Sequence, residues 1–360
     1  MVAVALMTAM SAQAQKLQTV DKDGQPVPYV TVIGEDGNFI GTTDLDGVLS
    51  DVKGAEVVTV THVAYKSKKV QVGNLPSFGG NEGGLRVTLE DADFDLPEIT
   101  VTKKPLVYVQ TYYRMLYVDD DPDNPLCYYR SGVLNNSYDR KTKKTSIDED
   151  HLSASNIGIF KTALNTALGP YIKRIAGLKM GKVENRMKQN YKAIGLTFTP
   201  DGPGKQVITD KYGTVGTVVD NDGERRYSYD TYKLKNHLIQ TTGSDKKKAK
   251  AEKRDNSKKN RVDQDYTVYR IDEQGNYSPE DFIMAQGSSS YDSDKAGYHV
   301  NILLQVFTTD RAYVDKDGLK QLKKENKMKM NYQNLLEFER AHKIPALSEQ
   351  FQKRIKEIVK

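Results

Sequence analysis

The chain has 360 residues, of which 38% are hydrophobic and 28% charged, and it contains no tryptophan. Its length predicts two or three domains rather than one small domain. The 53 basic and 48 acidic residues nearly balance, so the composition does not indicate the chain-wide basic surface typical of nucleic-acid-binding proteins.

The first 14 residues are small and apolar and end in Ala12-Gln13-Ala14, a pattern similar to the second half of a secretory signal peptide. We expect cleavage after Ala14 and export of the chain. The basic start of such a peptide is not present, which leaves open whether the natural start lies upstream of Met1. No later run approaches the ~20 apolar residues needed to span a bilayer. The single cysteine, Cys127, permits no internal disulfide, and its strand-like surroundings predict a buried thiol.

Residues 16–90 read as a small all-β sandwich. Short β-branched runs are separated by turn signals at Asp23-Gly24, Asp36-Gly37 and Asp46-Gly47. Apolar and polar residues alternate in the last strand of this segment, around Val87, as in two packed antiparallel sheets with one wet face each.

The order of motifs in this segment resembles a known family. Pro26-Val27-Pro28, then Gly41-Thr42-Thr43-Asp44, Asp46-Gly47-Val48 and a strand ending in Ala64-Tyr65 are similar to the carboxypeptidase-regulatory-like, transthyretin-like domain. The resemblance implies a Greek-key sandwich of the kind found at the front of Gram-negative envelope proteins. It therefore implies a location in the periplasm or at the periphery of the outer membrane.

The motifs that carry this resemblance form turns and are not catalytic. A zinc carboxypeptidase requires a His-x-x-Glu pair, and no histidine of this chain has Glu at the third position after it. Neither a Gly-x-Ser-x-Gly elbow, a phosphate loop nor a Cys-x-x-Cys pair is present. The sequence therefore predicts no enzyme, no cofactor and no metal site.

Residues 91–105 are predicted to be a linker, and residues 106–330 an α+β domain with a mainly antiparallel sheet and packed helices. Its first strands are rich in tyrosine, an amphipathic residue that suits a half-exposed sheet or a cleft wall. The tyrosines that we expect to form a ligand or partner surface are Tyr112, Tyr113, Tyr128 and Tyr129.

In the remaining chain, the spacing of apolar residues changes several times between a helical and a strand pattern. Residues 152–190 carry an apolar helical stripe that we expect to break at Gly169-Pro170, giving two helices packed on the sheet. Strand signals then run from Ala193 to Leu238. Residues 331–360 are predicted to form C-terminal helices packed on the second domain, with Ser348 as an N-cap.

A basic run interrupts the strand signals. Residues 244–261 are rich in lysine and are predicted to form a disordered loop. Lys246, Lys247 and Lys248 are expected to contact an anionic lipid or glycan surface. Because the run has no aromatic residue for stacking on bases, nucleic acid is not an expected partner.

Three functions remain open at this point. The first is a non-catalytic envelope protein whose sandwich is an interaction or spacer module and whose α+β domain binds a ligand or another envelope protein. The second is a periplasmic carrier of a lipid or other hydrophobic ligand, which requires an apolar groove. The third is an envelope glycan hydrolase that uses two carboxyl groups, for which no short motif exists.

Overall fold

The computed structural model describes residues 15–52, 54–74, 77–78, 84–94, 96, 98, 102–119, 126–176, 182–293 and 298–359. The expected signal peptide lies outside these residues. The described chain divides into two compact units, one containing the residues up to Val60 with Lys68–Leu89, and the other containing Thr61–Ser67 with the residues from Glu90 onward. Each unit is described by itself.

The first unit is β-rich and contains two four-stranded sheets with the orders β4-β1-β8-β7 and β3-β2-β5-β6. One pairing differs from the expected antiparallel pattern, because β1 runs parallel to β8. The turn before β4 needs glycine, since Gly47 has a φ of 69° and a Cβ there would lie 2.5 Å from the carbonyl oxygen of Thr19. The strands are β1 Leu17–Val20, β2 Thr31–Gly34, β3 Phe39–Thr42, β4 Val48–Leu49, β5 Val57–His62, β6 Tyr65–Gln71, β7 Ser77–Phe78 and β8 Gly84–Thr88, with a 3-10 turn η1 at Val72–Asn74.

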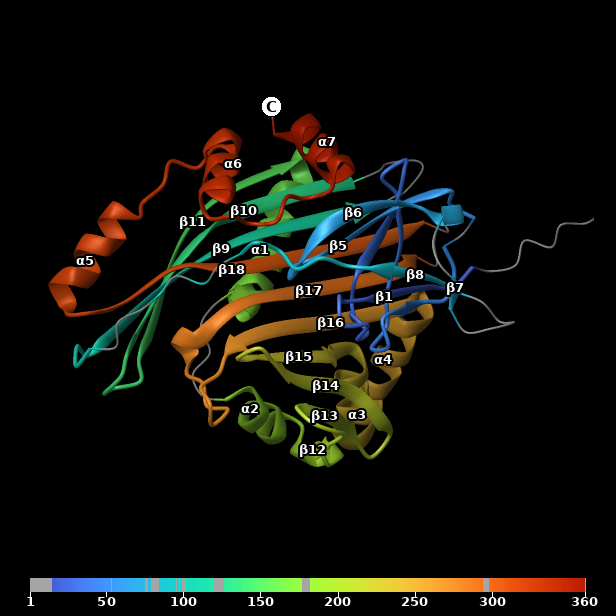
Figure 1. The fold of residues 1–360 in the computed structure, drawn as a ribbon, viewed down its shortest axis with the longest axis horizontal. Coiled ribbons are helices and arrows are strands. Elements are labelled where there is room, and N and C mark those ends of the chain that lie inside the picture. Colours follow the sequence, from blue (N-terminus) through green and yellow to red (C-terminus); the bar gives the residue numbers. More distant parts are fainter. Residues whose placement is uncertain are drawn as a thin grey trace, which may run out of the picture. The chain divides into compact units, whose positions relative to one another are not determined.

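The second unit is built on a ten-stranded sheet with the order β11-β10-β9-β18-β17-β16-β15-β14-β13-β12. All of its neighbouring strands are antiparallel. Figure 1 shows the long strands β9, β10, β17 and β18 side by side. The strands are β9 Leu106–Asp119, β10 Leu126–Asp139, β11 Thr145–Ser155, β12 Thr197–Pro200, β13 Lys205–Asp210, β14 Gly213–Asn221, β15 Glu224–Asp230, β16 Lys258–Arg270, β17 Phe282–Ser293 and β18 His299–Val314.

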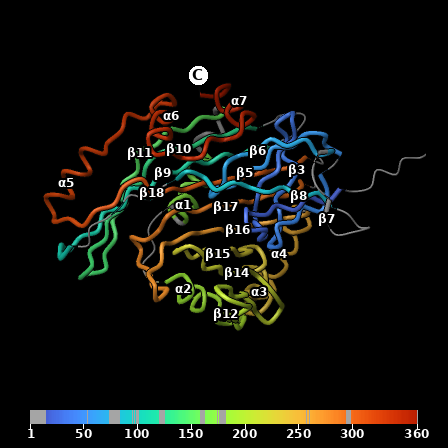
Figure 2. Tube along the Cα trace, viewed as in Figure 1, coloured from blue at the N-terminus to red at the C-terminus, as the bar shows by residue number. Residues whose placement is uncertain are grey.

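The sheet consists of two meanders, β9 to β11 and β12 to β18, joined where β18 pairs with β9. Because β11 and β12 lie at opposite edges, the chain between them must cross the sheet, as the trace in Figure 2 shows. That crossing contains the helices α1 Gly158–Ala176 and α2 Val183–Asn190 and the 3-10 turn η3 Lys192–Ile194. The α+β architecture with a mainly antiparallel sheet is therefore confirmed for the second unit.

Helices cover both faces of this sheet. The α1 face holds the main apolar core, which includes Met115, Ile172 and Leu304. The opposite face is covered by the C-terminal helices, where Arg114 of β9 forms an ion pair with Glu339. The remaining helices are α3 Thr231–Thr242, α4 Asp245–Ser257, α5 Lys316–Glu325, α6 Tyr332–Ala341 and α7 Glu349–Ile358, and a further 3-10 turn, η4, spans Pro279–Asp281. Ser348 caps α7 as predicted, since its side chain accepts a hydrogen bond from the amide of Phe351.

Several local predictions were wrong. Helix α1 continues through Gly169-Pro170, because its packing on the sheet outweighs the hydrogen bond that proline removes. The strand expected to reach Leu238 ends at Asp230, which caps α3 by accepting from the amide of Lys233. The linker expected over residues 91–105 stays a prediction; within it, the Phe94 ring packs against Phe307 of the sheet at a tilt of 59°, with ring centroids 5.4 Å apart.

The basic run is not a disordered loop. Its residues form helix α4 and the beginning of β16. The run contains many lysines together with Ala249, Ala251 and Glu252, all strong helix formers, and Ala251 is buried at 6% exposure. The burial of Ala251 and the helix propensity of the residues around it stabilise a helix in this segment, although its charge pattern alone indicates disorder.

Candidate functional site

The four tyrosines of the expected binding surface are buried. Adjacent residues of a strand point to opposite faces, so the pairs Tyr112-Tyr113 and Tyr128-Tyr129 are each split between the two faces of the sheet. Their exposed fractions lie between 0% and 2%. They therefore form no exposed surface in this structure, and the sequence prediction on this point is wrong.

On the α1 face, Tyr113 and Tyr128 belong to a polar cluster around Glu149. The Tyr113 hydroxyl donates to a Glu149 carboxylate oxygen at 2.5 Å, and Arg130 forms an ion pair with the same oxygen. The Tyr128 hydroxyl donates to Asn165 of α1 at 2.6 Å. The contacts of Glu149 join β9 and β10 to β11, and the Tyr128 contact fixes α1 to β10.

The electrostatics of this cluster keep Glu149 ionised. Burial alone would raise the pKa of Glu149, but hydrogen bonds from Tyr113 and Arg130 and the Arg130 charge outweigh it and hold the pKa below its usual value. Burial also raises the pKa of Tyr113 well above its ordinary value. His151 and Lys173 form the rim, with nitrogen atoms 3.6 Å and 3.7 Å from the carboxylate. A carboxylate with a lowered pKa beside tyrosines with raised ones acts as a docking ion pair rather than as a general acid.

On the other face, Tyr112 lies in a buried network that holds α6. Its hydroxyl and the Arg114 guanidinium both donate to Glu339, at 2.7 Å and 2.9 Å. Arg114 also donates to Gln305 at 2.7 Å and to the carbonyl oxygen of Pro345 at 2.6 Å. This network connects the sheet to α6 and to the segment before α7.

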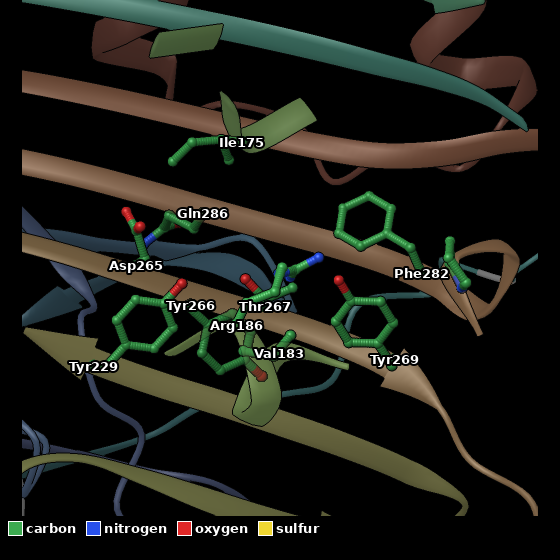
Figure 3. A pocket seen from close by; sticks show the side chains of 11 residues that line it. Ile175, Val183, Arg186, Tyr229, Asp265, Tyr266, Thr267, Tyr269, Phe282 and Gln286 are labelled. Carbon is green, nitrogen blue, oxygen red and sulfur yellow. The ribbon is translucent and has the colours of Figure 1, made fainter. Parts of the chain in front are cut away.

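A pocket on the α1 face is lined by Ile175 from the last turn of α1 and by Val183 and Arg186 of α2, together with side chains of the sheet (Figure 3). Strand register places Asp265 opposite both Tyr229 of β15 and Gly287 of β17, so Asp265 and Tyr229 enter the pocket from the same face. Its lining combines aromatic, apolar and charged side chains with backbone, from Ile175, Val183, Arg186, Tyr229, Asp265, Tyr266, Thr267, Tyr269, Pro279, Phe282 and Gln286.

The pocket is small and polar in places. Its volume of about 30 Å³ matches the space of about one water molecule in the liquid. Asp265 is buried at 4% exposure. Burial raises the pKa of Tyr269, and the charge of Arg186 and a hydrogen bond from it act in the opposite direction. As it stands the pocket accommodates water between polar groups and has no room for a lipid chain.

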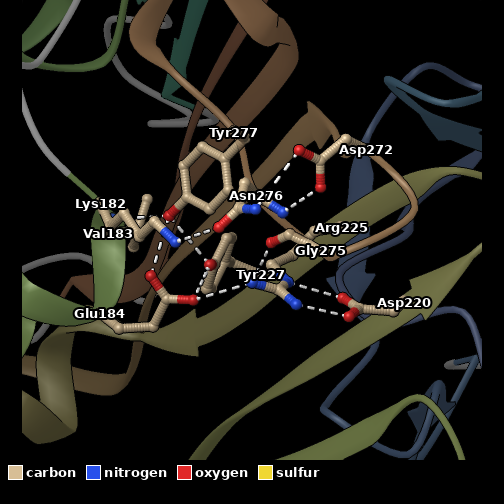
Figure 4. Close-up of polar contacts among 10 residues, drawn as sticks. All are labelled: Lys182, Val183, Glu184, Asp220, Arg225, Tyr227, Asp272, Gly275, Asn276 and Tyr277. Atoms are coloured by element: carbon tan, nitrogen blue, oxygen red, sulfur yellow. Dashed lines mark hydrogen bonds and ion pairs between the residues drawn. The ribbon is translucent and has the colours of Figure 1, made fainter.

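Beside the pocket, α2 closes a second polar network (Figure 4). The Glu184 carboxylate accepts from the hydroxyl of Tyr227 and, at 2.9 Å, from that of Tyr277. The two hydroxyl oxygens are 3.0 Å apart. Arg225 contacts the same carboxylate at 3.3 Å and binds Asp220 through two bonds of 2.7 Å and 2.5 Å. Every charged group of this network thus has an opposite partner.

The network also receives backbone groups. The Val183 amide at the start of α2 donates to the Tyr277 hydroxyl at 2.7 Å, and Arg225 donates to the carbonyl oxygen of Gly275 at 3.2 Å. Burial raises the pKa values of Tyr227 and Tyr277 above their ordinary value. Both hydroxyls therefore stay protonated and act as hydrogen-bond donors, which indicates a role in holding α2 rather than in proton transfer.

The lysines expected to contact an anionic surface lie on α4. Lys246 and Lys247 are exposed and Lys248 is partly exposed. Helix α4 packs beside β16, which is separated from β9 in the sheet order by β17 and β18. The structure therefore does not bring the two sets of predicted residues into one site.

Sequence reasoning missed Glu184, Arg225, Tyr227 and Tyr277. Only one signal existed for them, the alternation of Tyr227 and Tyr229 in a strand-like run, which places both side chains on one face. Their partner Glu184 lies in a short helix with no distinctive motif. Among the described residues, no group of histidine, cysteine and acidic side chains has a geometry that could hold a metal ion.

Comparisons with known proteins identify no family. Neither a family model nor a curated protein matches the chain. Among solved structures, a protein of unknown function from the DUF3598 family of Nostoc punctiforme is 9% identical with a TM-score of 0.16, covering 78% of this chain and 93% of its own. The dehydratase domain of RzxB from Pseudomonas fluorescens is 12% identical with a TM-score of 0.11, covering 55% of this chain and 76% of its own. Scores this low extend neither a fold nor a function to this chain.

Proposed function

We propose that this chain is an exported, non-catalytic envelope protein. In this proposal the first unit is a carboxypeptidase-regulatory-like, Greek-key sandwich that acts as an interaction or spacer module. The second unit binds a partner through its outer surface. The export pattern at Ala12-Gln13-Ala14 and the turn motifs of residues 16–90 support the first part of the proposal.

The observation that supports the second part is that three carboxylates in the interior already have hydrogen-bond or ion-pair partners within the chain. Glu184, Glu149 and Glu339 each accept hydrogen bonds or ion pairs from two or more neighbouring side chains. A carboxyl group that serves as a catalytic acid needs a raised pKa, whereas hydrogen bonds from Tyr113 and Arg130 hold the pKa of Glu149 below its usual value. The pocket at Asp265, at about 30 Å³, is much smaller than the several hundred Å³ typical of small-molecule sites, and an open pocket beside Tyr277, at about 240 Å³, is also below that range. Recognition is thereby left to the outer surface.

Native mass spectrometry of the protein purified from a Gram-negative periplasm, followed by lipid extraction, tests this proposal. We expect a mass equal to that of the polypeptide and no co-extracted lipid. A stoichiometric hydrophobic adduct that survives desalting would overturn the proposal in favour of a carrier.

A parallel incubation with purified peptidoglycan tests the non-catalytic part. No soluble sugar fragments should appear over the level released by a heat-denatured sample. Release of fragments that scales with protein concentration would show a glycan hydrolase.

A further inference from the structure

Helix α4 presents a row of lysines away from the body of the second unit. Residues three and four apart share a helix face, so Lys246, Lys250 and Lys253 form one row, here called the lysine stripe. All three side chains are exposed, whereas Ala251, on the opposite side of the helix, is buried at 6% exposure. The stripe is about 10 Å long, since the helix rises about 1.5 Å per residue.

The stripe is held on a fixed support. At the other end of α4, Arg254 donates to Asn236 of α3 at 2.7 Å and forms an ion pair with Asp255 at 3.0 Å. The Arg254 guanidinium also lies over the Tyr232 ring at 5.6 Å. These contacts anchor α4 to α3, so the lysines are presented by a docked helix and not by a free loop.

The stripe lysines have no acidic partner within the described part of the chain. No ion pair joins Lys246, Lys250 or Lys253 to any described carboxylate, although Asp245 and Glu252 lie on the same helix. Other surface lysines of this unit do pair, as Lys323 does with Asp148. The stripe therefore presents uncompensated positive charge.

This charge arrangement opposes the stability of the helix. Lysines in the first turn are repelled by the positive N-terminal end of the helix dipole, and Lys246 is in that turn. Lys246 and Lys250 are also four apart, a spacing at which like charges destabilise a helix. Residues that break a local stability rule without a compensating contact are expected where a function requires them.

The chemistry of the stripe fits a bilayer surface better than a protein. Protein interfaces are depleted of lysine and centre on aromatic residues or arginine, and the stripe contains neither. A straight row of flexible point charges matches a plane of anionic headgroups, for which each lysine near the surface adds about fivefold in affinity. Exposed large apolar side chains are not present on α4, so the contact is electrostatic and does not involve insertion.

We propose that the lysine stripe of α4 docks the second unit on a membrane surface rich in anionic phospholipid. This inference rests on the proposed function, since it names the partner of the outer surface. The lysines of the stripe place their ammonium groups among lipid phosphates. The bound state is therefore reversible and sensitive to salt.

Vesicle flotation with the full chain tests this inference. We expect the protein to float with vesicles of phosphatidylcholine containing 30% phosphatidylglycerol, to stay in solution with pure phosphatidylcholine, and to dissociate in 0.5 M salt, where charges are screened within a few Å. The triple variant K246Q/K250Q/K253Q should lose affinity by about 100-fold, at about fivefold per lysine. Its urea midpoint should stay equal to that of the parent chain or rise, because the repulsion along α4 is relieved.

A matched control removes the same charge elsewhere. Lys141, Lys143 and Lys144 are exposed in the turn between β10 and β11, and K141Q/K143Q/K144Q should change affinity less than threefold. If both triple variants lost the same affinity for vesicles, the effect would come from net charge, and the proposal that the lysine stripe binds membranes would be overturned. The absence of flotation, or retention on dextran sulfate without flotation, would also overturn it.

Failure of the inference can be told apart from failure of the proposed function. If the native mass equals that of the polypeptide and the protein does not float with vesicles, only the proposal that the lysine stripe binds membranes is overturned. A hydrophobic adduct in the native mass overturns the non-carrier function whatever the vesicles show.

Discussion

At the scale of single residues, tyrosine hydroxyls and arginine guanidinium groups satisfy several carboxylates in the interior of the second unit. Glu184 shows this most clearly, since two tyrosine hydroxyls and one guanidinium converge on its carboxylate. Arg225 keeps Asp220 as a partner if the Glu184 carboxylate is removed, but the buried hydroxyls of Tyr227 and Tyr277 lose their acceptor, and an unsatisfied buried donor costs about 1–3 kcal/mol.

We therefore expect Glu184→Ala to lower the free energy of unfolding of the second unit by about 1–3 kcal/mol. The matched control is Glu252→Ala on the exposed side of α4, which should change it by less than about 0.5 kcal/mol. Urea denaturation followed by circular dichroism measures both. Equal effects of the two changes would show that the network contributes nothing specific.

His62 is a buried neutral histidine of the second unit. It is 1% exposed, its Nδ1 atom accepts from the amide of Ala64 at 3.2 Å, and none of the described residues forms a hydrogen bond with its buried Nε2 atom. Its ring lies edge-on to Tyr266, with centroids 4.6 Å apart. Burial, assisted by the charge of Arg226, lowers the pKa of His62 to about 3.

The lowered pKa predicts a loss of stability in acid. Between pH 6.5 and about 3 the unfolded chain binds a proton at His62 that the folded chain does not, so the free energy of unfolding falls as pH falls, by up to about 1.4 kcal/mol per pH unit. In His62→Asn the side-chain oxygen can still accept from Ala64, but this titration is gone. Urea midpoints measured from pH 4.5 to 8 should therefore decline less steeply for the variant. Parallel declines would contradict the assignment.

At the scale of elements, the position of α1 depends on a glycine in the strand below it. A Cβ at Gly287 of β17 would lie 2.4 Å from the Tyr171 hydroxyl oxygen and 2.9 Å from Ile175 Cδ1. Contacts this short do not occur between packed atoms, so the helix or its side chains would have to shift. The sheet thus accepts α1 because one of its central strands lacks a side chain at this point.

We expect Gly287→Ala to destabilise the second unit by about 1–3 kcal/mol through overpacking. In the double variant with Tyr171→Ala the cost should be smaller than the sum of the two single changes, because the clash is removed. Thermal unfolding of the four proteins measures the coupling. Additive effects would show that Tyr171 and position 287 do not meet.

Helices and strands were predicted correctly where the spacing of apolar residues and the capping residues agreed. The predictions were wrong where they were based on a charged run or on a proline. Ser348 was recognised as the cap of α7 because a serine preceding an apolar helical stripe is a local signal. Pro170 was expected to end a helix, and the lysines of residues 244–261 were expected to prevent one. At Pro170 and in residues 244–261, contacts with residues far away in the chain outweighed the local signal. A short stretch of sequence does not include those distant residues, so it could not predict the contacts.

At the scale of the whole molecule, the turn between β5 and β6 and the strand ends beside it belong to the second unit. The segment Thr61–Ser67 groups with the large sheet, where the Val63 amide donates to the Gln286 side chain at 3.0 Å. Gln286 in turn accepts from Gln305 at 3.1 Å, next to Arg114. The second unit therefore depends on residues that precede it in the chain by more than twenty positions.

A shortened chain of residues 90–360 tests this dependence. It lacks Val63, so the Gln286 oxygen loses a donor, and it lacks the His62 ring that packs on Tyr266. We expect amides of β16 and β17 to exchange hydrogen faster than in the intact chain by more than tenfold, while those of β13 and β14 stay within threefold. Identical exchange in the two chains would show that the segment contributes nothing to the second unit.

The sequence by itself determined the turn-rich β character of residues 16–90, the existence of an antiparallel α+β unit and the helical C-terminus, because hydrophobic period and turn residues are local. It also located the basic run, though not its helical form. Only the tertiary structure decided that the paired tyrosines are buried on opposite faces, that α1 and α2 cross the sheet and that Glu184 meets Tyr277. Those facts depend on pairings between strands far apart in the chain, and such pairings are set by how the whole core packs rather than by any local pattern.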